Sequence, residues 1–207
     1  MIRFVSTASL LALLVLVLYL PSAYPPERFI NQLRTEHELT VDFWGHDHAM
    51  RILSRMLDLQ ATAQQASPVP SLANAPAPNP VDLAVAKQMS EVNTRLFNNP
   101  YFRSIDTLLA LATYRFCAFI EWLPVLLVFM VAVLLDGFLL RIIKSKEFLQ
   151  HNPEMYALHA CAAIVTVCAT VVAFVLPVTL PPLVFSIVPV AVSVFASRAL
   201  ANFHRRG

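Results

Sequence analysis

A chain of 207 residues that is 57% apolar and only 14% charged is too hydrophobic for an ordinary soluble domain, which makes the lipid bilayer its expected solvent. Phosphate-binding loops need several closely spaced glycines, and the chain has only three glycines in total, which argues against nucleotide-binding folds. The net charge of +2, with basic residues dispersed along the chain, argues against direct nucleic-acid binding.

The first element is an uncharged apolar run from Phe4 to Leu20, preceded by Arg3. At about 1.5 Å per residue, a helix of this length nearly crosses a hydrocarbon core of about 30 Å. A cleaved signal peptide is the alternative, because small residues follow the run at 21–23. The run, however, exceeds the usual apolar region of about 7 to 15 residues and lacks an Ala-x-Ala site. We expect residues 1–24 to be an uncleaved transmembrane anchor.

The next segment, residues 25–103, is more polar and carries three short stripes of apolar residues at helical spacing. The stripes are Phe29, Ile30 and Leu33; Met50, Ile52, Leu53, Met56 and Leu57; and Val85, Met89, Val92 and Leu96. Residues 67–80, between the second and third stripes, are rich in Ser, Pro, Ala and Asn and predict an extended linker. Such short amphipathic helices hardly build a core alone, so we expect them to pack on each other, on the membrane surface or on a partner chain.

Motifs for catalysis or metal binding are weak in this sequence. His46 and His48 flank Asp47, but no third and fourth zinc ligands follow at a definable spacing, so a polar helix start is the preferred interpretation. There is no GxSxG or HExxH motif, and the three cysteines lie in apolar runs without a CxxC pair. We expect no enzymatic activity, no catalytic residue, no bound metal and no cofactor.

The last part, residues 104–207, predicts a long helix followed by the remaining membrane spans. From Ser104, apolar residues recur every three to four positions directly into a second span at 116–135, so one long helix should stand out of the membrane. A third span at 157–176 and a fourth at about 183–200 are separated by a turn containing Pro177, Pro181 and Pro182. The fold class is therefore all-α: a polytopic membrane protein with four transmembrane helices and a partly helical extracytoplasmic segment.

Positive residues in short loops predict the orientation, because cytoplasmic flanks collect Lys and Arg. With four spans, one side receives Arg3, Arg141, Lys144, Lys146, Arg205 and Arg206. The proline-rich turn, which has no Lys or Arg, falls on the other side. We expect a multi-pass protein of the bacterial inner membrane, with both termini cytoplasmic and residues 25–104 periplasmic.

Four ionisable residues in or near the spans are costly there, at roughly 2.5 to 3.5 kcal/mol for a charge at the bilayer centre. They are Glu121, Asp136, His159 and Arg198. The last three fall at the cytoplasmic edge and can meet, either as a proton or ion path or as a structural latch in which Asp136 pairs with Arg198 or Arg141. We favour the latch because no second acidic site continues a path across the membrane. For Glu121, near the opposite edge and close to Arg115, a paired or snorkelling position suffices.

Residues 95–206 resemble a family of membrane proteins of unknown biochemical activity carried by integrative and conjugative elements and related plasmids. The residues that carry the resemblance are Arg103-Ser104-Ile105, Leu108, Leu109, Tyr114-Arg115, Glu121-Trp122-Leu123-Pro124, Asp136-Gly137, Arg141, Lys144, Phe148, Asn152-Pro153, Tyr156, Leu176-Pro177, Pro181-Pro182 and Ala201-Asn202-Phe203. The resemblance implies a role in conjugative DNA transfer, because genes of this family lie beside that of the coupling ATPase of a type IV secretion channel.

Together these features predict an accessory or structural component of a conjugative secretion apparatus. The expected partners are membrane lipid and, as the resemblance implies, the coupling ATPase or other inner-membrane conjugation subunits; a second copy of the chain is a further candidate. Candidate structural or interaction residues are Arg115, Glu121, Trp122, Pro124, Asp136, Gly137, Arg141, His159 and Arg198. Two alternatives stay open: a small proton-coupled transporter using Asp136, His159 and Arg198, and an entry-exclusion protein acting in the recipient cell.

Overall fold

The described part of the chain is helical and without strands, which confirms the all-α prediction. A computed structural model describes residues 2–66, 100–146 and 152–203. Its helices are α1 (Ile2–Ala23), α2 (Pro26–Trp44), α3 (His46–Ala66), α5 (Pro100–Lys146), α6 (Pro153–Val175) and α7 (Val184–Asn202). Four of them, α1, α5, α6 and α7, are long and apolar enough to cross a membrane, as the sequence predicts. The linker at 67–80 and the stripe from Val85 to Leu96 lie outside the described residues.

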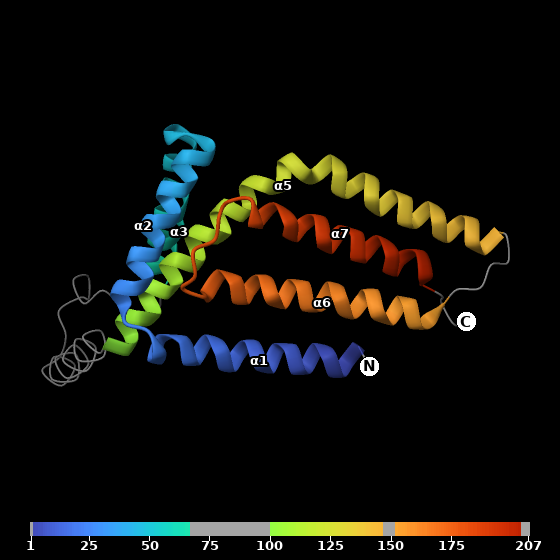
Figure 1. Cartoon of the computed structure of the whole chain (residues 1–207), viewed down its shortest axis with the longest axis horizontal. Coiled ribbons are helices and arrows are strands. Elements are labelled where there is room, and N and C mark those ends of the chain that lie inside the picture. Colours follow the sequence, from blue (N-terminus) through green and yellow to red (C-terminus); the bar gives the residue numbers. More distant parts are fainter. Residues whose placement is uncertain (1, 67–99, 147–151, 204–207) are drawn as a thin grey trace, which may run out of the picture.

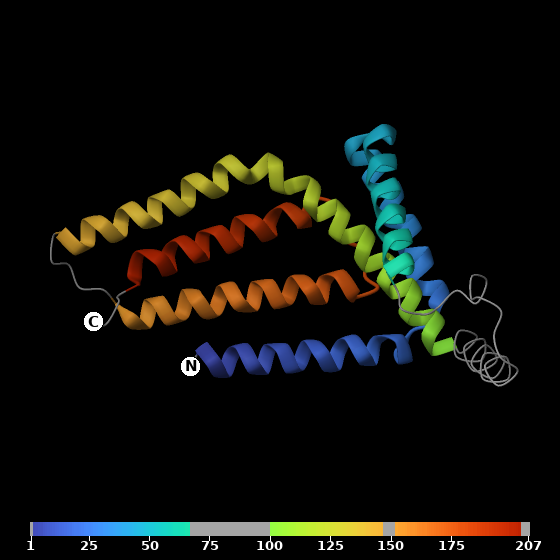
Figure 2. The same ribbon diagram turned by 180° about the vertical axis from the view of Figure 1, so that it is seen from behind.

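The four membrane helices lie side by side in a row. Figures 1 and 2 show the order α5, α7, α6, α1 from two opposite sides, and α7 packs against both α5 and α6. Ile2 of α1 and Asn202 of α7 lie at the same end of the row, together with the end of α5 and the start of α6. We call this the far end. It follows that α5 and α7 run in the same direction.

Helix α5 is one continuous helix of 47 residues, which at about 1.5 Å per residue makes it roughly 70 Å long. This is more than twice the thickness of a hydrocarbon core of about 30 Å, so its first part extends beyond the row. The continuous helix confirms the sequence prediction, but α5 does not stand free. It bends along its length and its first part leans against α2 and α3 (Figure 1). Pro124 lies inside α5, and a proline removes a backbone donor and typically kinks a helix.

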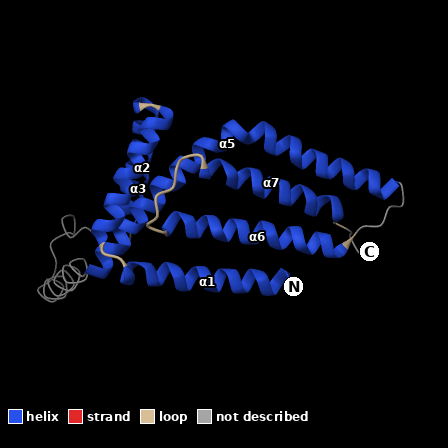
Figure 3. Ribbon diagram, viewed as in Figure 1, coloured by secondary structure: helices blue, strands red, loops and turns tan. Residues whose placement is uncertain are grey.

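Helices α2 and α3 form a hairpin that packs across the first part of α5 (Figure 3); we call α2, α3 and residues 100–122 of α5 the head. The hairpin turns at Gly45, whose φ of 84° lies in the left-handed region that favours glycine at the end of a helix. One apolar cluster joins the hairpin to α5 through Ile52, Met56 and Cys117. A second cluster joins the ends of α1 and α6 to the head and includes Leu20, Phe29, Leu108, Leu111 and Val175. Within the two stripes that the structure describes, Phe29, Ile52 and Met56 are therefore buried, whereas Ile30, Met50 and Leu57 stay exposed.

Candidate functional site at the proline loop

The head contains a buried ion pair between Arg115 of α5 and Glu36 of α2. The Arg115 side chain is fully buried and that of Glu36 is 2% exposed. Nε of Arg115 donates to Oε2 of Glu36 at 2.8 Å, and Nη2 donates to Oε1 at 2.5 Å. A planar guanidinium matches a carboxylate in this two-pronged geometry, which makes such pairs stronger and more directional than single hydrogen bonds. The pair thereby fixes how α2 lies on α5.

The remaining donors of Arg115 bind the last residues of α6 and the loop that connects α6 to α7, residues 176–182, which we call the proline loop. Nη1 donates to the carbonyls of Ala173 and Leu176, each at 2.6 Å, and to that of Phe174 at 3.2 Å. Nη2 also donates to the carbonyl of Val178 at 2.7 Å. The last carbonyls of a helix lack partners within it and carry partial negative charge, so a cation at this point is favourable. Arg115 thus caps the end of α6.

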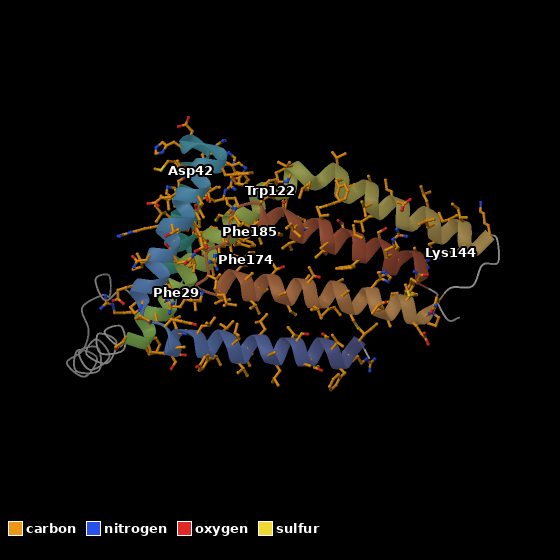
Figure 4. All side chains as sticks on the ribbon, in the orientation of Figure 1. Phe29, Asp42, Trp122, Lys144, Phe174 and Phe185 are labelled. Atoms are coloured by element: carbon orange, nitrogen blue, oxygen red, sulfur yellow. The ribbon has the colours of Figure 1, made fainter. Side chains whose placement is uncertain are left out.

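The proline loop depends on side chains from the head for its hydrogen bonds. Pro177, Pro181 and Pro182 have no N–H group, which limits how far the loop can bond to itself. Glu36 Oε1 accepts from the backbone N–H of Leu180 at 3.1 Å, and the indole Nε1 of Trp122 donates to the carbonyl of Pro182 at 3.0 Å. Figure 4 shows Trp122, Phe174 and Phe185 close to the loop, where α5, α6 and α7 converge. One buried arginine, one glutamate and one tryptophan therefore join the head to the membrane helices.

A second, more exposed contact joins the turn of the hairpin to α5. Oε1 of Glu121 accepts from Nη1 of Arg55 at 2.6 Å, and its Oε2 lies 3.5 Å from Nε2 of His48. The rings of Trp44 and Trp122 pack beside this pair with centroids 5.3 Å apart, and Trp44 also contacts His48 at 4.6 Å. The partner of Glu121 is thus α3, and Arg115, the neighbour considered from the sequence, is bound to Glu36 instead.

At the far end, the end of α5 contacts the end of α7. The Arg141 guanidinium lies 4.9 Å from the centroid of the Phe203 ring, and Lys144 Nζ donates to Oδ1 of Asn202 at 2.8 Å. Tyr156 of α6 packs on the same Phe203 ring at 5.4 Å. Figure 4 places Lys144 close to the end of α5. Arg141 and Lys144 therefore join α5 to the end of α7, and Tyr156 brings α6 to the same Phe203 ring.

The expected meeting of Asp136, His159 and Arg198 is not formed by the described residues. Asp136 and Arg198 are exposed, and within the described part of the chain neither makes an ion pair. Nδ1 of His159 bonds to the carbonyl of Met155, one turn earlier in its own helix, at 2.7 Å. Near these residues α5 approaches α7 closely at Gly137, where an added Cβ would lie 2.5 Å from the carbonyl oxygen of Ser197. The glycine thus brings α5 and α7 into backbone contact beside the two charges.

Sequence reasoning missed Glu36, although a signal for it was present. Phe29, Leu33, Glu36 and Thr40 recur every three to four residues, so the carboxylate lies on the apolar stripe of α2, and Phe29, Glu36 and Thr40 are all buried. A charge on such a stripe needs a buried partner, and Arg115 lies on the buried side of α5. The separation of 79 residues between them hid the pairing.

The chemistry of this site is that of a joint between helices. Every buried side-chain nitrogen and oxygen in the described part of the chain has a hydrogen-bond partner. Among the described residues no three His, Cys, Asp or Glu side chains gather in a way that could hold a metal ion. What the arrangement does is hold the head at a fixed angle on the membrane helices.

Comparison with known proteins gives the family. A family model described as IncC plasmid conjugative DNA transfer protein DtrJ-like matches residues 43–204, which is more than half of the chain. The chain belongs to the DtrJ-like family. This confirms the resemblance to a conjugative-element family, and membership implies a role in conjugative DNA transfer. The match begins at the end of α2 and includes α3, which the resemblance seen in the sequence did not reach. No curated protein and no solved structure matches the chain.

Proposed function

We propose that the chain is an accessory, structural component of the inner-membrane part of a conjugative type IV secretion and coupling apparatus. It holds other proteins during DNA transfer, and the coupling ATPase or inner-membrane channel subunits are the partners that we propose. The observation that carries this is the Arg115–Glu36 joint, which combines α2, α5 and the proline loop into one unit. A head braced in this way can transmit a contact to the membrane helices without bending.

The surface proposed for a partner is the outward side of α3. Ile52 and Met56 face the head core, whereas Met50 and Leu57, which lie farther around the helix, are 44% and 53% exposed. Exposed apolar residues that gather on one side of a helix mark contact surfaces, and Met50 and Leu57 lie seven residues apart on the same side of α3. Their neighbour Asp58 is also exposed, so a charged position of the same helix is available for comparison.

The orientation that we propose places the head in the periplasm and the far end in the cytoplasm. Arg3, Arg141, Lys144 and Lys146 lie at or near the far end, and cytoplasmic flanks of bacterial spans are enriched in such residues. In this arrangement both described termini of the row, Ile2 and Asn202, are cytoplasmic. The far end would then face the coupling ATPase, and the head would face periplasmic parts of the channel.

Transfer from donor cells tests this proposal. We expect deletion of the gene in the donor to reduce transfer strongly, and deletion in the recipient to leave it unchanged. A tagged copy purified from gently solubilised donor membranes should bring down the coupling ATPase or inner-membrane channel subunits. The paired change Met50→Glu and Leu57→Glu should abolish co-purification of the channel subunits that contact the head, whereas the control Asp58→Lys should retain it. Unaffected transfer from deleted donors would refute the proposal, and an effect seen only in recipients would indicate entry exclusion instead.

A further inference from the structure

One side of the α5–α7 pair is left open along its length. Within α7, the residues that are exposed are Ile187, Val194 and Arg198, spaced seven and four residues apart, so they lie on a single stripe of the helix. Ile187 is 62% exposed and Val194 is 37% exposed. The other residues of α7 are buried or partly buried, since α7 packs between α5 and α6.

The neighbouring stripe of α5 faces the same side. Val125, Phe129, Asp136 and Ile143 recur at spacings of four and seven, and the three apolar members are 69%, 41% and 47% exposed. Gly137 of α5 meets Ser197 of α7, and the two helices run in the same direction. At about 100° per residue, the position before Gly137 and the position after Ser197 therefore point to the same side of the row. We call these two stripes together the α5–α7 face.

This face carries one acid and one base at similar depth in an otherwise apolar surface. Asp136 precedes Gly137 and Arg198 follows Ser197, so both charges lie on the same side of the contact between these two residues. Within the described residues neither charge has an ion-pair partner. Charged side chains in membrane spans are costly unless they are paired or reach water. A face with neighbouring opposite charges is complementary to a second copy of itself, because rotation by 180° about the membrane normal places each acid opposite a base.

We propose that two copies of the chain associate in the membrane through the α5–α7 face, with Asp136 of each copy paired to Arg198 of the other. Phe129 and Val194 pack around the two ion pairs. The contact is isologous, so both copies use the same residues. This inference does not depend on the proposed partners in DNA transfer.

Charge reversal between differently tagged full-length copies tests the pairing. Asp136→Arg and Arg198→Asp should each lower self-association in lipid nanodiscs by about tenfold or more, because each places like charges opposite one another. Mixing the two variants should restore association to the wild-type level, since both pairs are re-formed between the unlike copies. Asp106→Arg, at an exposed position of α5 in the head, should have no effect. Wild-type copies that do not associate, or single variants that the mixture does not rescue, would overturn the proposal.

Disulfide formation gives a test that needs no charge change. In a chain whose Cys117, Cys161 and Cys168 are replaced by Ala, a copy with Phe129→Cys should crosslink under mild oxidation to a copy with Ile187→Cys. The control Val128→Cys changes the adjacent residue, which is 75% exposed but lies about 100° farther around α5. It should not crosslink to the Ile187→Cys copy. Equal crosslinking from both positions would contradict the proposed face.

Discussion

Replacing Arg115 with Ala should lower the free energy of unfolding by about 3–5 kcal/mol, because it leaves the Glu36 carboxylate buried without its partner. Glu36→Ala should cost a similar amount for the opposite reason, since it strands the guanidinium. Both effects can be measured by unfolding the protein in detergent micelles and monitoring the loss of its helical circular-dichroism signal. Arg115→Lys should recover little, because a lysine offers three donors from one point and cannot reach a carboxylate and several loop carbonyls together.

The control for this prediction is the exposed ion pair of the same head. Arg55→Ala removes one of the two partners of Glu121, but the Arg55 side chain is 45% exposed, so the expected cost is within about 1 kcal/mol. The double variant Glu36→Ala with Arg115→Ala should remain clearly destabilised, since the carbonyls of Ala173, Leu176 and Val178 still lose their hydrogen-bond donor. An Arg115→Ala protein as stable as the Arg55→Ala protein would show that the joint does not hold the head.

The second large effect is expected at Gly137, where even one added methyl group has no room. Gly137→Ala would place its Cβ 2.5 Å from the carbonyl oxygen and 2.6 Å from Oγ of Ser197, so α5 and α7 must separate. Such overpacking typically costs about 1–3 kcal/mol, and Gly137→Leu should cost more and prevent stable insertion. The thermal midpoint of the purified protein and its abundance in membranes measure the two variants.

One further variant shows whether Gly137 contacts the backbone or the side chain of Ser197, and a second serves as the control. Ser197→Gly should not rescue Gly137→Ala, because the carbonyl oxygen of residue 197 stays in place when Oγ is removed. Ala132→Val, at an exposed position of α5, should leave both stability and abundance unchanged. Full rescue by Ser197→Gly would mean that only the hydroxyl limits the approach of the two helices.

The four membrane helices could be predicted from the sequence because a helix that crosses the hydrocarbon core must be long and apolar. A span needs a long uncharged apolar run, and Phe4 to Leu20 supplies one as plainly as the stretch before Asp136 does. The long helix into the second span was equally visible, since its apolar residues keep helical spacing from Ser104 onward. The spans and the long helix each depend on residues that are close together in the sequence, so their pattern can be seen in a single sequence.

The sequence marks Glu36 as a charge on an apolar stripe, but it does not reveal the partners of the joint at the proline loop, because they come from three distant segments. Arg115 and Trp122 were candidates from the sequence, but the acceptors of Arg115 are a glutamate 79 residues away and backbone carbonyls of the α6–α7 connection. Backbone carbonyls are the same at every residue, so no sequence pattern marks them as partners. The close contact of Gly137 with Ser197 was hidden in the same way, since only the packing of α5 on α7 reveals it.

We expect the head and the far end to lie on opposite sides of a membrane that the chain crosses four times. Cysteine labelling measures this directly, in a chain without its three native cysteines and with either Asp42→Cys in the head or Ser145→Cys at the far end; both positions are exposed. In intact cells, a membrane-impermeant maleimide should label the Asp42→Cys protein and should reach the Ser145→Cys protein only after the inner membrane is permeabilised. Labelling of both positions from the same side would contradict the four-span arrangement and the role proposed from it.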